Sequence, residues 1–398
     1  MSGKQIFGLD LTTVVKAGPG SRIQVPKTFA GMGSKHVALV TDKGLVEAGV
    51  IDKVAEAFEE SDVTIAGIFD GVRQDNDTRD INEIAQWYKD IGADGILGVG
   101  GGSVMDAAKA AKVMLGMGAT DILDLFGGRT IVSYARPKAK PLGIPHISIP
   151  TTSGTGAEVS QGSAILHAET RKKLIFFHQH SNSDFAFLDP ELTVSLPRHL
   201  TAEPAFDSLV HCFEGFFTPL HNSFADALAL RAARLILDNL PIAVDDPANL
   251  DARGELQAAS TMSVTASVSG RGAAPIHNFA DAVGPAYGIS HGLSNAVYAP
   301  IVMRNFPEHY LPRIREFVLG LGVQVGAKND QELLDDLIVE VENLQKKTGI
   351  PTRFDIDIDA ERFNHLVTEV KQDPAGLQYP LPDEVITTCL KESVNVSA

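Results

Sequence analysis

The fold is constrained most strongly by an alternation of short apolar runs and amphipathic stretches in the first half of the chain. The strand-like runs cover residues 36–41, 64–69, 95–98 and 146–149, and the helix-like stretches between them cover residues 45–60, 79–91 and 104–115. A strand followed by a helix, repeated in this way, predicts a parallel sheet with helices on both faces. We therefore expect an N-terminal α/β domain, with a further strand at residues 185–188.

The second half of the chain shows helical periodicity almost throughout. Apolar positions recur at helical spacing over residues 202–217, 223–240, 255–270, 293–305, 331–347, 360–370 and 382–392. Clusters of Pro, Gly, Asn and Asp separate these stretches, as is typical of helix ends. The predicted organisation is an α/β domain over residues 1–190 and an all-helical domain over residues 191–398.

Charge and cysteine content argue against several classes of partner. The chain carries 34 Lys and Arg against 50 Asp and Glu, a formal net charge of −16, whereas nucleic acids and anionic membranes attract basic surfaces. Its two cysteines are too few for a disulfide framework. The sequence shows no apolar stretch of about 18 residues and no secretory leader pattern. We expect a cytoplasmic protein that acts on small molecules and binds neither nucleic acid nor membrane.

A glycine run, GVGGGS, between a predicted strand and a predicted helix has the properties of a phosphate-binding loop. Gly100, Gly101 and Gly102 would let the backbone approach a pyrophosphate without Cβ clashes, and the N–H groups of the next helix would face the anion. Ser103 and Asp106 match a variant of the capping box and predict where that helix starts. The alternative is a glycine-rich turn without a ligand. The run also differs from the ordinary Gly-x-Gly-x-x-Gly fingerprint.

An acidic residue, Asp42, lies at the end of the first predicted strand. Its carboxylate could accept hydrogen bonds from an adenosine ribose and would repel a 2′-phosphate, which favours NAD over NADP. The alternative is a helix N-cap, a common place for Asp. A polar loop at residues 150–158 (PTTSGTGAE) could line the other side of the cofactor, although taken alone it is only a loop with turn chemistry.

Four residues in the helical half can form a metal site: Asp207, His211, His277 and His291. Asp207 and His211 are spaced to share one face of a helix, and the other two lie further along the chain. One carboxylate and three imidazoles suit a divalent cation such as Zn²⁺ or Fe²⁺ and leave room for a substrate oxygen. The alternative is a set of buried, satisfied histidines and a surface carboxylate.

Other residues of these types carry weaker signals. His178 and His180, in His178-Gln179-His180, have no clear partner in the sequence. Cys212, beside His211, is expected to point away from the metal-binding face and to pack in the core.

Taken together, these motifs resemble those of the iron-containing (group III) alcohol dehydrogenases, a family that includes lactaldehyde:propanediol oxidoreductase and butanol dehydrogenases. The resemblance rests on motifs that occur in family order and at family spacing across most of the chain: Thr41-Asp42-Lys43, GGGSVMDAAK at residues 100–109, PTTSGTGAE at residues 150–158, Asp207-x3-His211, and His277 with His291-Gly292.

The resemblance implies a Rossmann-like dinucleotide-binding domain and a helical metal-binding domain, the dehydroquinate synthase-like architecture, with the active site in the cleft between them. It implies that Asp207, His211, His277 and His291 bind Fe²⁺, or Zn²⁺ in some relatives. It also implies that NAD is bound by the glycine loop and by Asp42, Gly101, Gly102, Ser103, Thr151, Thr152, Ser160 and Lys173. Many members of the family are dimers or larger, so a homo-oligomer is expected.

The chain departs from the family pattern at three places. Asp281 stands where relatives often carry a second histidine, thought to relay a proton; Asp281 could relay a proton, compete for the metal or be an ordinary polar residue. The familiar Asn-Pro-Thr triplet reads Asn76-Asp77-Thr78. Arg271, six residues before His277, could hold a carboxylate or sulfonate of the substrate, although an exposed or structural Arg is the alternative.

The function that these features predict is metal-dependent transfer of hydride between NAD(H) and a small alcohol or aldehyde, with the metal acting as a Lewis acid on the substrate oxygen. One alternative is a reductase of an anionic aldehyde or oxo acid held by Arg271. Another is a metal-dependent lyase or hydrolase on the same scaffold, although a hydrolase would leave the glycine run and Asp42 unexplained.

Overall fold

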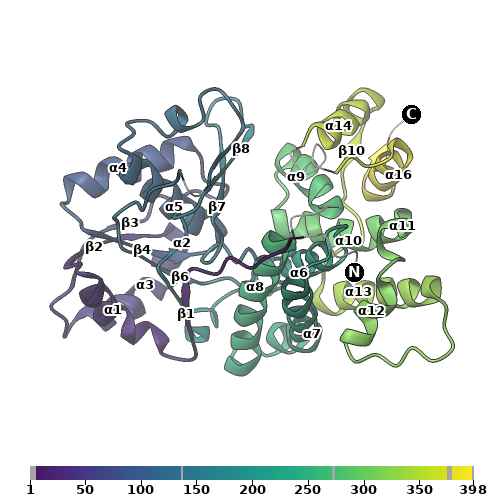
Figure 1. Ribbon diagram of the computed structural model, residues 1–398, viewed down its shortest axis with the longest axis horizontal. Coiled ribbons are helices and arrows are strands. Elements are labelled where there is room, and N and C mark those ends of the chain that lie inside the picture. The colour runs from purple at the N-terminus through teal and green to yellow at the C-terminus, as the bar shows by residue number, and fades with distance from the viewer. Residues whose placement is uncertain (1–5, 136–137, 271–273, 374–378, 397–398) are drawn as a thin grey trace. The chain divides into compact units, whose positions relative to one another are not determined.

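The computed structural model describes residues 6–135, 138–270, 274–373 and 379–396. The chain forms two compact units, which Figure 1 shows in purple to blue and in teal to yellow. One unit spans Leu11–Ser195, and the other combines Leu196–Ala398 with Met1–Asp10. The first contains a parallel sheet with helices and the second is almost entirely helical, so the predicted fold class is confirmed.

The α/β unit is built on a six-stranded sheet with the strand order β1-β9-β6-β4-β2-β3. Every pair of neighbours in it is parallel. Its strands are β1 (Val14–Ala17), β2 (His36–Val40), β3 (Thr64–Phe69), β4 (Gly95–Gly100), β6 (His146–Pro150) and β9 (Phe185–Leu188). The inner strands β4 and β6 are buried along their whole length. This agrees with the sequence of β4, which has no polar side chain, because helices cover both faces of a parallel sheet.

Each face of this sheet has its own hydrophobic core. Side chains alternate along β2, so Ala38 and Val40 pack with helices α4 (Thr78–Asp90) and α5 (Gly102–Met117). Val37 and Leu39 pack on the other face with α1 (Val25–Met32) and α3 (Val50–Ala55). The helix expected over residues 45–60 is divided into α2 (Lys43–Glu47), α3 and a 3₁₀ turn (Glu56–Phe58), because Gly49 adopts a left-handed conformation with φ of 68°.

A second, three-stranded sheet in this unit has the order β5-β8-β7 and was not expected from the sequence. It comprises β5 (Ile131–Tyr134), β7 (Gly162–Leu166) and β8 (Lys173–His178). Further 3₁₀ turns span Ser21–Gln24, Ile122–Leu125 and Pro190–Leu192. His178 ends β8, and Gln179 and His180 begin the segment that leads to the start of β9 in the main sheet.

The helical unit is organised around α6 (Arg198–Phe216), which packs against α7, α8, α9 and α10. Its helices are α7 (Ser223–Asp245), α8 (Leu250–Gly270), α9 (Pro275–Tyr287), α10 (His291–Asn305), α11 (Pro307–Tyr310), α12 (Ile314–Gly320), α13 (Asp330–Thr348), α14 (Ala360–Gln372) and α16 (Asp383–Ser393), with short strands β10 (Asp357–Ile358) and β11 (Asn395–Val396). Phe206, Leu209, Val210 and Phe213 place α6 in the core. Within the described residues, no helix is long and apolar enough to span a bilayer.

Candidate metal centre and cofactor loop

Three acidic or imidazole side chains follow one face of helix α6. Asp207, His211 and Glu214 are spaced at i, i+4 and i+7, so they lie along one side of the helix. Asp207 and Glu214 are both buried. A buried carboxylate is costly unless it is paired with opposite charge or metal, so this face of α6 marks a site where positive charge is expected.

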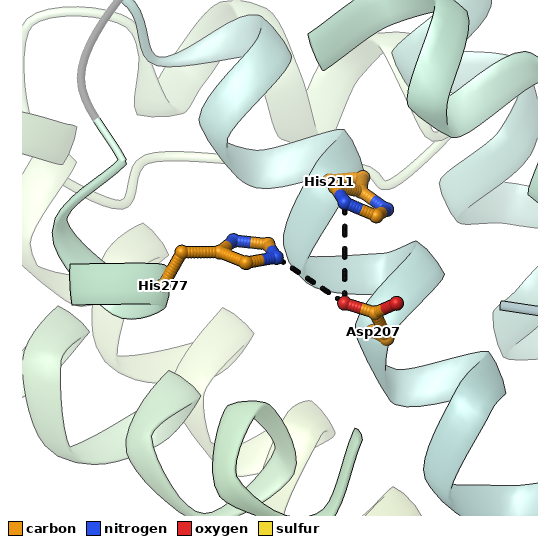
Figure 2. Close-up of side chains that lie close together, drawn as sticks. All are labelled: Asp207, His211 and His277. Carbon is orange, nitrogen blue, oxygen red and sulfur yellow. Dashed lines mark hydrogen bonds and ion pairs between the residues drawn. The ribbon is translucent and has the colours of Figure 1, made fainter. Parts of the chain in front are cut away.

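The predicted metal residues meet at one carboxylate oxygen. Oδ1 of Asp207 lies 3.2 Å from Nε2 of His277, 3.5 Å from Nε2 of His291 and 3.9 Å from Nε2 of His211. Figure 2 shows Asp207 and His211 on one helix, with the His277 ring reaching toward them from another. One ligand atom from each of these three residues lies within 4.8 Å of the others. The structure therefore brings together, from three helices, the four residues chosen from sequence.

The protonation states around this point favour a bound cation. Burial alone would raise the pKa of the Asp207 carboxyl, but His211, His291 and His277 hold it far below its usual value. Burial lowers the pKa of His211 to about 4, although Asp207 opposes the shift. A metal binds ionised carboxylate and neutral imidazole, so Asp207 and His211 are already in the binding form at neutral pH. This donor set fits Fe²⁺ or Zn²⁺.

Glu214 was not selected from the sequence. Its carboxylate contacts the Nδ1 side of the His277 ring. Its Oε1 accepts the backbone N–H groups of Ile276 at 2.8 Å and His277 at 3.0 Å. Its Oε2 accepts the ring Nδ1–H of His277 at 2.5 Å. Burial would lower the pKa of His277, but Glu214 and Asp207 raise it well above its usual value. Because Nδ1 is engaged by Glu214, Nε2 of His277 is left to face Asp207.

Two more polar residues contact the cluster from α9 and α10. Oδ1 of Asp281 lies 3.2 Å from Nδ1 of His291, on the side of the ring away from Asp207. Asn295, one turn after His291, donates its Nδ2–H to Oδ1 of Asp207 at 2.9 Å. Asn295 was not selected in the sequence, but its i+4 spacing from His291 is a signal that would have found it.

Gly292 explains how His291 comes so close to α6. A Cβ at this position would lie 2.5 Å from the backbone oxygen of Glu203, so α10 can approach α6 here only with glycine. Ser290 begins the helix, since its Oγ accepts the N–H of Leu293 at 3.2 Å. The same hydroxyl donates to the Glu203 carboxylate. The His-Gly pair in the sequence thus reflects a close backbone contact beside His291, a candidate metal ligand.

The glycine loop joins β4 to α5 at the carboxyl edge of the sheet. A Cβ on Gly100 would lie 2.6 Å from Val104, and one on Gly102 would lie 2.7 Å from Thr155. The loop at residues 150–158 therefore packs directly against the glycines. The predicted capping by Ser103 and Asp106 is wrong: Gly101 is the N-cap and makes no side-chain cap, while Ser103 Oγ accepts the N–H of Asp75 at 3.2 Å.

Asp42 caps a helix, as the alternative interpretation held. Its Oδ1 accepts the N–H of Leu45 at 3.0 Å at the start of α2. Burial raises the pKa of Asp42, and the backbone hydrogen bonds oppose the shift. The cap uses Oδ1 and leaves Oδ2 out of this contact, so capping does not compete with a hydrogen bond from Asp42 to a ribose. That ribose contact stays a prediction. Asp42, the glycine loop and the loop after β6 follow adjacent strands of one sheet.

The other predicted cofactor residues occupy different places in the α/β unit. Thr151 and Thr152 follow β6, and the N–H of Thr151 donates to Gly100 O at 2.9 Å. Ser160 Oγ accepts from the buried Nζ of Lys109 at 2.9 Å, so Ser160 is fixed to α5. Lys173 begins β8 in the smaller sheet. Arg271, the predicted contact for a substrate anion, lies outside the described residues.

Comparison with known families and proteins gives one consistent result. Residues 12–190 match the family described as iron-containing alcohol dehydrogenase, and residues 201–390 match the C-terminal part of the Fe-containing alcohol dehydrogenase family. Long-chain-alcohol dehydrogenase 1 of Geobacillus thermodenitrificans is 31% identical to this chain, and the match covers 84% of this chain and 82% of that dehydrogenase. Lactaldehyde reductase of Escherichia coli is 30% identical over 80% of this chain and 81% of its own.

Solved structures show the same architecture over nearly the whole chain. A 1,3-propanediol oxidoreductase superposes with a TM-score of 0.87 at 25% identity, covering 97% of this chain and 99% of that one. Sulfoacetaldehyde reductase from Bifidobacterium kashiwanohense, solved in complex with NAD⁺, superposes with a TM-score of 0.82 at 24% identity, covering 96% and 97%. The second likeness concerns the fold alone.

Proposed function

Because the chain belongs to the iron-containing alcohol dehydrogenase family, we propose that it transfers hydride between NAD(H) and a small alcohol or aldehyde at the site formed by α6, α9 and α10. The family and the enzyme class predicted from sequence are thereby confirmed. The residue roles that follow are proposals supported by the geometry of this chain.

The observation that carries the proposal is the convergence of three imidazoles on Asp207. We propose that Asp207, His211, His277 and His291 hold Fe²⁺, a donor set that would also accept Zn²⁺. When bound, the cation supplies Lewis acidity toward a substrate oxygen. In this assignment His277 is both a ligand and part of the catalytic centre.

Two carboxylates, Glu214 and Asp281, contact the Nδ1 atoms of His277 and His291 and so determine which ring nitrogen faces Asp207. Glu214 accepts the Nδ1–H of His277, so Nε2 is the ring nitrogen that faces Asp207 and would bind the cation. The contact of Asp281 with Nδ1 of His291 supports the same orienting role on the third helix. Carboxylates that hold ligand histidines in this way tune metal affinity in many proteins. The role of Asp281 as a proton relay stays a prediction.

The α/β unit supplies the dinucleotide site in this proposal. Ligands of open parallel sheets bind at the carboxyl ends of the strands, where the loops after β2, β4 and β6 lie side by side. The N-terminus of α5 would face the pyrophosphate, because Gly101 brings no side-chain cap to it. Asp42 would bind the adenosine ribose and select NAD over NADP.

Some predictions remain open beside this proposal. The anionic-substrate alternative depends on Arg271, so it stays a prediction, and no described residue favours the lyase or hydrolase alternative. Small alcohols or aldehydes are the substrate class that the family supports. A homo-oligomer and a cytoplasmic location stay predictions.

The proposal is tested by anaerobic oxidation of NADH with Fe²⁺-loaded protein and a panel of short neutral and anionic aldehydes. We expect turnover that disappears with a chelator and returns when Fe²⁺ is added back. A preference for anionic aldehydes would support a role for Arg271. Bound metal and bound NADH without turnover of any aldehyde would contradict the proposed reaction.

A further inference from the structure

A cavity in the α/β unit lies at the edge of the main sheet where the strands begin, opposite the glycine loop. Its volume is about 480 Å³, within the range of pockets that hold small organic molecules. It is lined by residues that precede strands β1, β2, β6 and β9, and by the C-terminal half of α5. The glycine loop follows the end of β4, so none of its residues lines this cavity.

The cavity contains one buried cation, Lys112 of α5. Its side chain is only 5% exposed, and its Nζ donates to the backbone oxygen of Asn182 at 2.9 Å. The nearest carboxylate oxygen, Oδ2 of Asp184, is 3.8 Å away and accepts the N–H of His146 at 2.8 Å. An ammonium group has three N–H donors. Asn182 accepts one of them, and Asp184 forms an ion pair with the group at a distance longer than a direct hydrogen bond. Among the described residues, the ammonium therefore has more N–H donors than direct acceptors.

Of the other titratable groups around Lys112, Asp184 places one carboxylate on the wall and His146 is uncharged. His146 is wholly buried, and burial together with Lys112 and Lys109 lowers its pKa well below the usual value, so it is neutral. Burial also lowers the pKa of Lys112 itself, and Asp184 opposes this shift. His180 lines the cavity, where the backbone N–H of His180 donates to Nδ1 of His178. The lining therefore offers an anionic ligand one lysine ammonium, with one carboxylate beside it.

The rest of the wall supplies one further donor and an apolar surface. Gln179 lines the cavity, and its buried Nε2 has no hydrogen-bond partner among the described residues. A buried amide N–H without a partner is unfavourable and is normally satisfied by a ligand or water. Leu142, Ile144 and Met32 form much of the remaining wall. Lys112 and Gln179 supply donors and the aliphatic side chains supply an apolar surface, a combination that suits an amphipathic molecule.

We propose that this cavity binds a small organic monocarboxylate, with its carboxylate on Lys112 and Gln179 and its short apolar body against Leu142 and Ile144. A single ammonium matches a single negative charge, while Asp184, half exposed beside it, disfavours a dianion. The proposal concerns a site separate from the dinucleotide and metal residues. It also gives a role to the His178-Gln179-His180 segment, which the reaction does not use.

The test is binding of butyrate to the full-length protein, measured by isothermal titration calorimetry in parallel with n-butanol and inorganic phosphate. We expect saturable binding of butyrate at millimolar concentration and no saturable binding of butanol, which lacks the charge. In Lys112→Met, which keeps the length of the side chain, butyrate affinity should fall at least about tenfold. Lys140→Met removes an exposed lysine next to the lining loop and should bind butyrate like the wild type.

A second measurement does not depend on the folding of a variant. Amide hydrogen exchange of the wild-type protein with and without butyrate should slow at residues 179–184 and in the C-terminal half of α5. Protection confined to other residues, equal affinity in Lys112→Met and Lys140→Met, or phosphate binding tighter than butyrate would each overturn the proposal. Absence of saturable butyrate binding would also overturn it, and Lys112 would then be a brace between α5 and residue 182.

Discussion

Oε2 of Glu214 and Nδ1 of His277 lie 2.5 Å apart, and the other oxygen of the same carboxylate accepts the first backbone N–H groups of α9. The residue at the N-cap of α9, Ala274, makes no side-chain cap. Glu214 therefore supplies the missing cap from a different helix while it orients the ring of His277, a proposed metal ligand. Formation of α9 and orientation of His277 depend on one side chain.

The first prediction separates these two roles of Glu214. Glu214→Gln keeps an oxygen that can accept the N–H groups of α9 but removes the charge that holds Nδ1–H of His277. We expect roughly 10- to 100-fold weaker binding of Fe²⁺ or Zn²⁺, measured by competition with a chelator, with little change in Tm. Glu214→Ala should lose metal affinity and also about 1 kcal/mol of stability from the lost cap.

The matched control for Glu214 is Asp238→Asn on α7, whose carboxylate makes an exposed ion pair with Arg234. Such pairs contribute little, so both metal affinity and Tm should stay at wild-type values. If Glu214→Gln binds metal as tightly as Asp238→Asn, the carboxylate does not tune the site.

The second prediction concerns the ligand histidines themselves. Replacing His277 or His291 by Ala removes one of the nitrogens that face Asp207, so we expect loss of the bound metal and of aldehyde-dependent NADH oxidation. His199→Ala, an exposed histidine near the start of α6, is the control and should keep both. Metal content measured on the purified variants distinguishes loss of metal from loss of turnover alone. A metal-loaded, fully active His291→Ala would contradict the ligand assignment.

The sequence indicated the four proposed ligand residues because their spacing signals are local. Asp207 and His211 are one helical turn apart, and the later histidines stand in short motifs, so four residues could be chosen without coordinates. Glu214 lies on the same helix face, yet nothing in the sequence shows that it meets the first turn of α9. That contact depends on how two helices pack, which residue spacing within one helix does not reveal.

The main elements of the α/β unit were predicted for the same reason, and their exceptions have identifiable causes. Strands β2, β4 and β6 read as short runs rich in apolar residues and were expected within one or two residues. The small sheet was missed because β7 contains Gly162 and Ser163 and β8 follows the polar stretch at residues 167–172. The start of α5 was misread because Ser103 bonds to the loop at Asp75 instead of to its own helix.

The third prediction tests Asp42 as a selector of NAD. Asp42→Asn keeps an oxygen that can cap α2 but removes the negative charge that would repel a 2′-phosphate. We expect the ratio of kcat/KM for NAD and NADP to fall at least about tenfold, with unchanged Tm. Asp42→Gly should relax the preference as well, at a cost of a few tenths of a kcal/mol for the lost cap. Unchanged discrimination in both variants would show that Asp42 serves only as a cap.

The fourth prediction concerns Gly292 and the approach of α10 to α6. Gly292→Ala places a methyl group 2.5 Å from the Glu203 backbone oxygen, so α10 must move and carry His291 with it. We expect a loss of roughly 1–3 kcal/mol in the free energy of unfolding, measured by urea denaturation, together with weaker metal binding. Gly31→Ala in α1 is the control, because a Cβ there meets nothing within 4 Å. A Gly292→Ala protein as stable as Gly31→Ala would show that the backbone can adjust.

The fifth prediction concerns stability at acid pH and rests on His309, which is buried and stacks on Phe306 with ring centroids 5.5 Å apart. Burial lowers the pKa of His309 to about 4, although Glu214 opposes the shift, while the unfolded chain keeps a value near 6.5. Between these values the unfolded state binds a proton that the folded state does not, so the free energy of unfolding must fall as pH falls from about 6.5 to about 4.

Replacing His309 by Phe keeps a ring against Phe306 and removes this titration. We expect the loss of stability between pH 7 and pH 4.5, measured by urea denaturation, to be smaller than in the wild type by about 1–3 kcal/mol. His365 is exposed, so His365→Phe serves as the control for replacing a histidine by phenylalanine at the surface. An identical decline with pH in His309→Phe and in the wild type would mean that His309 is protonated to the same extent in the folded and unfolded chain.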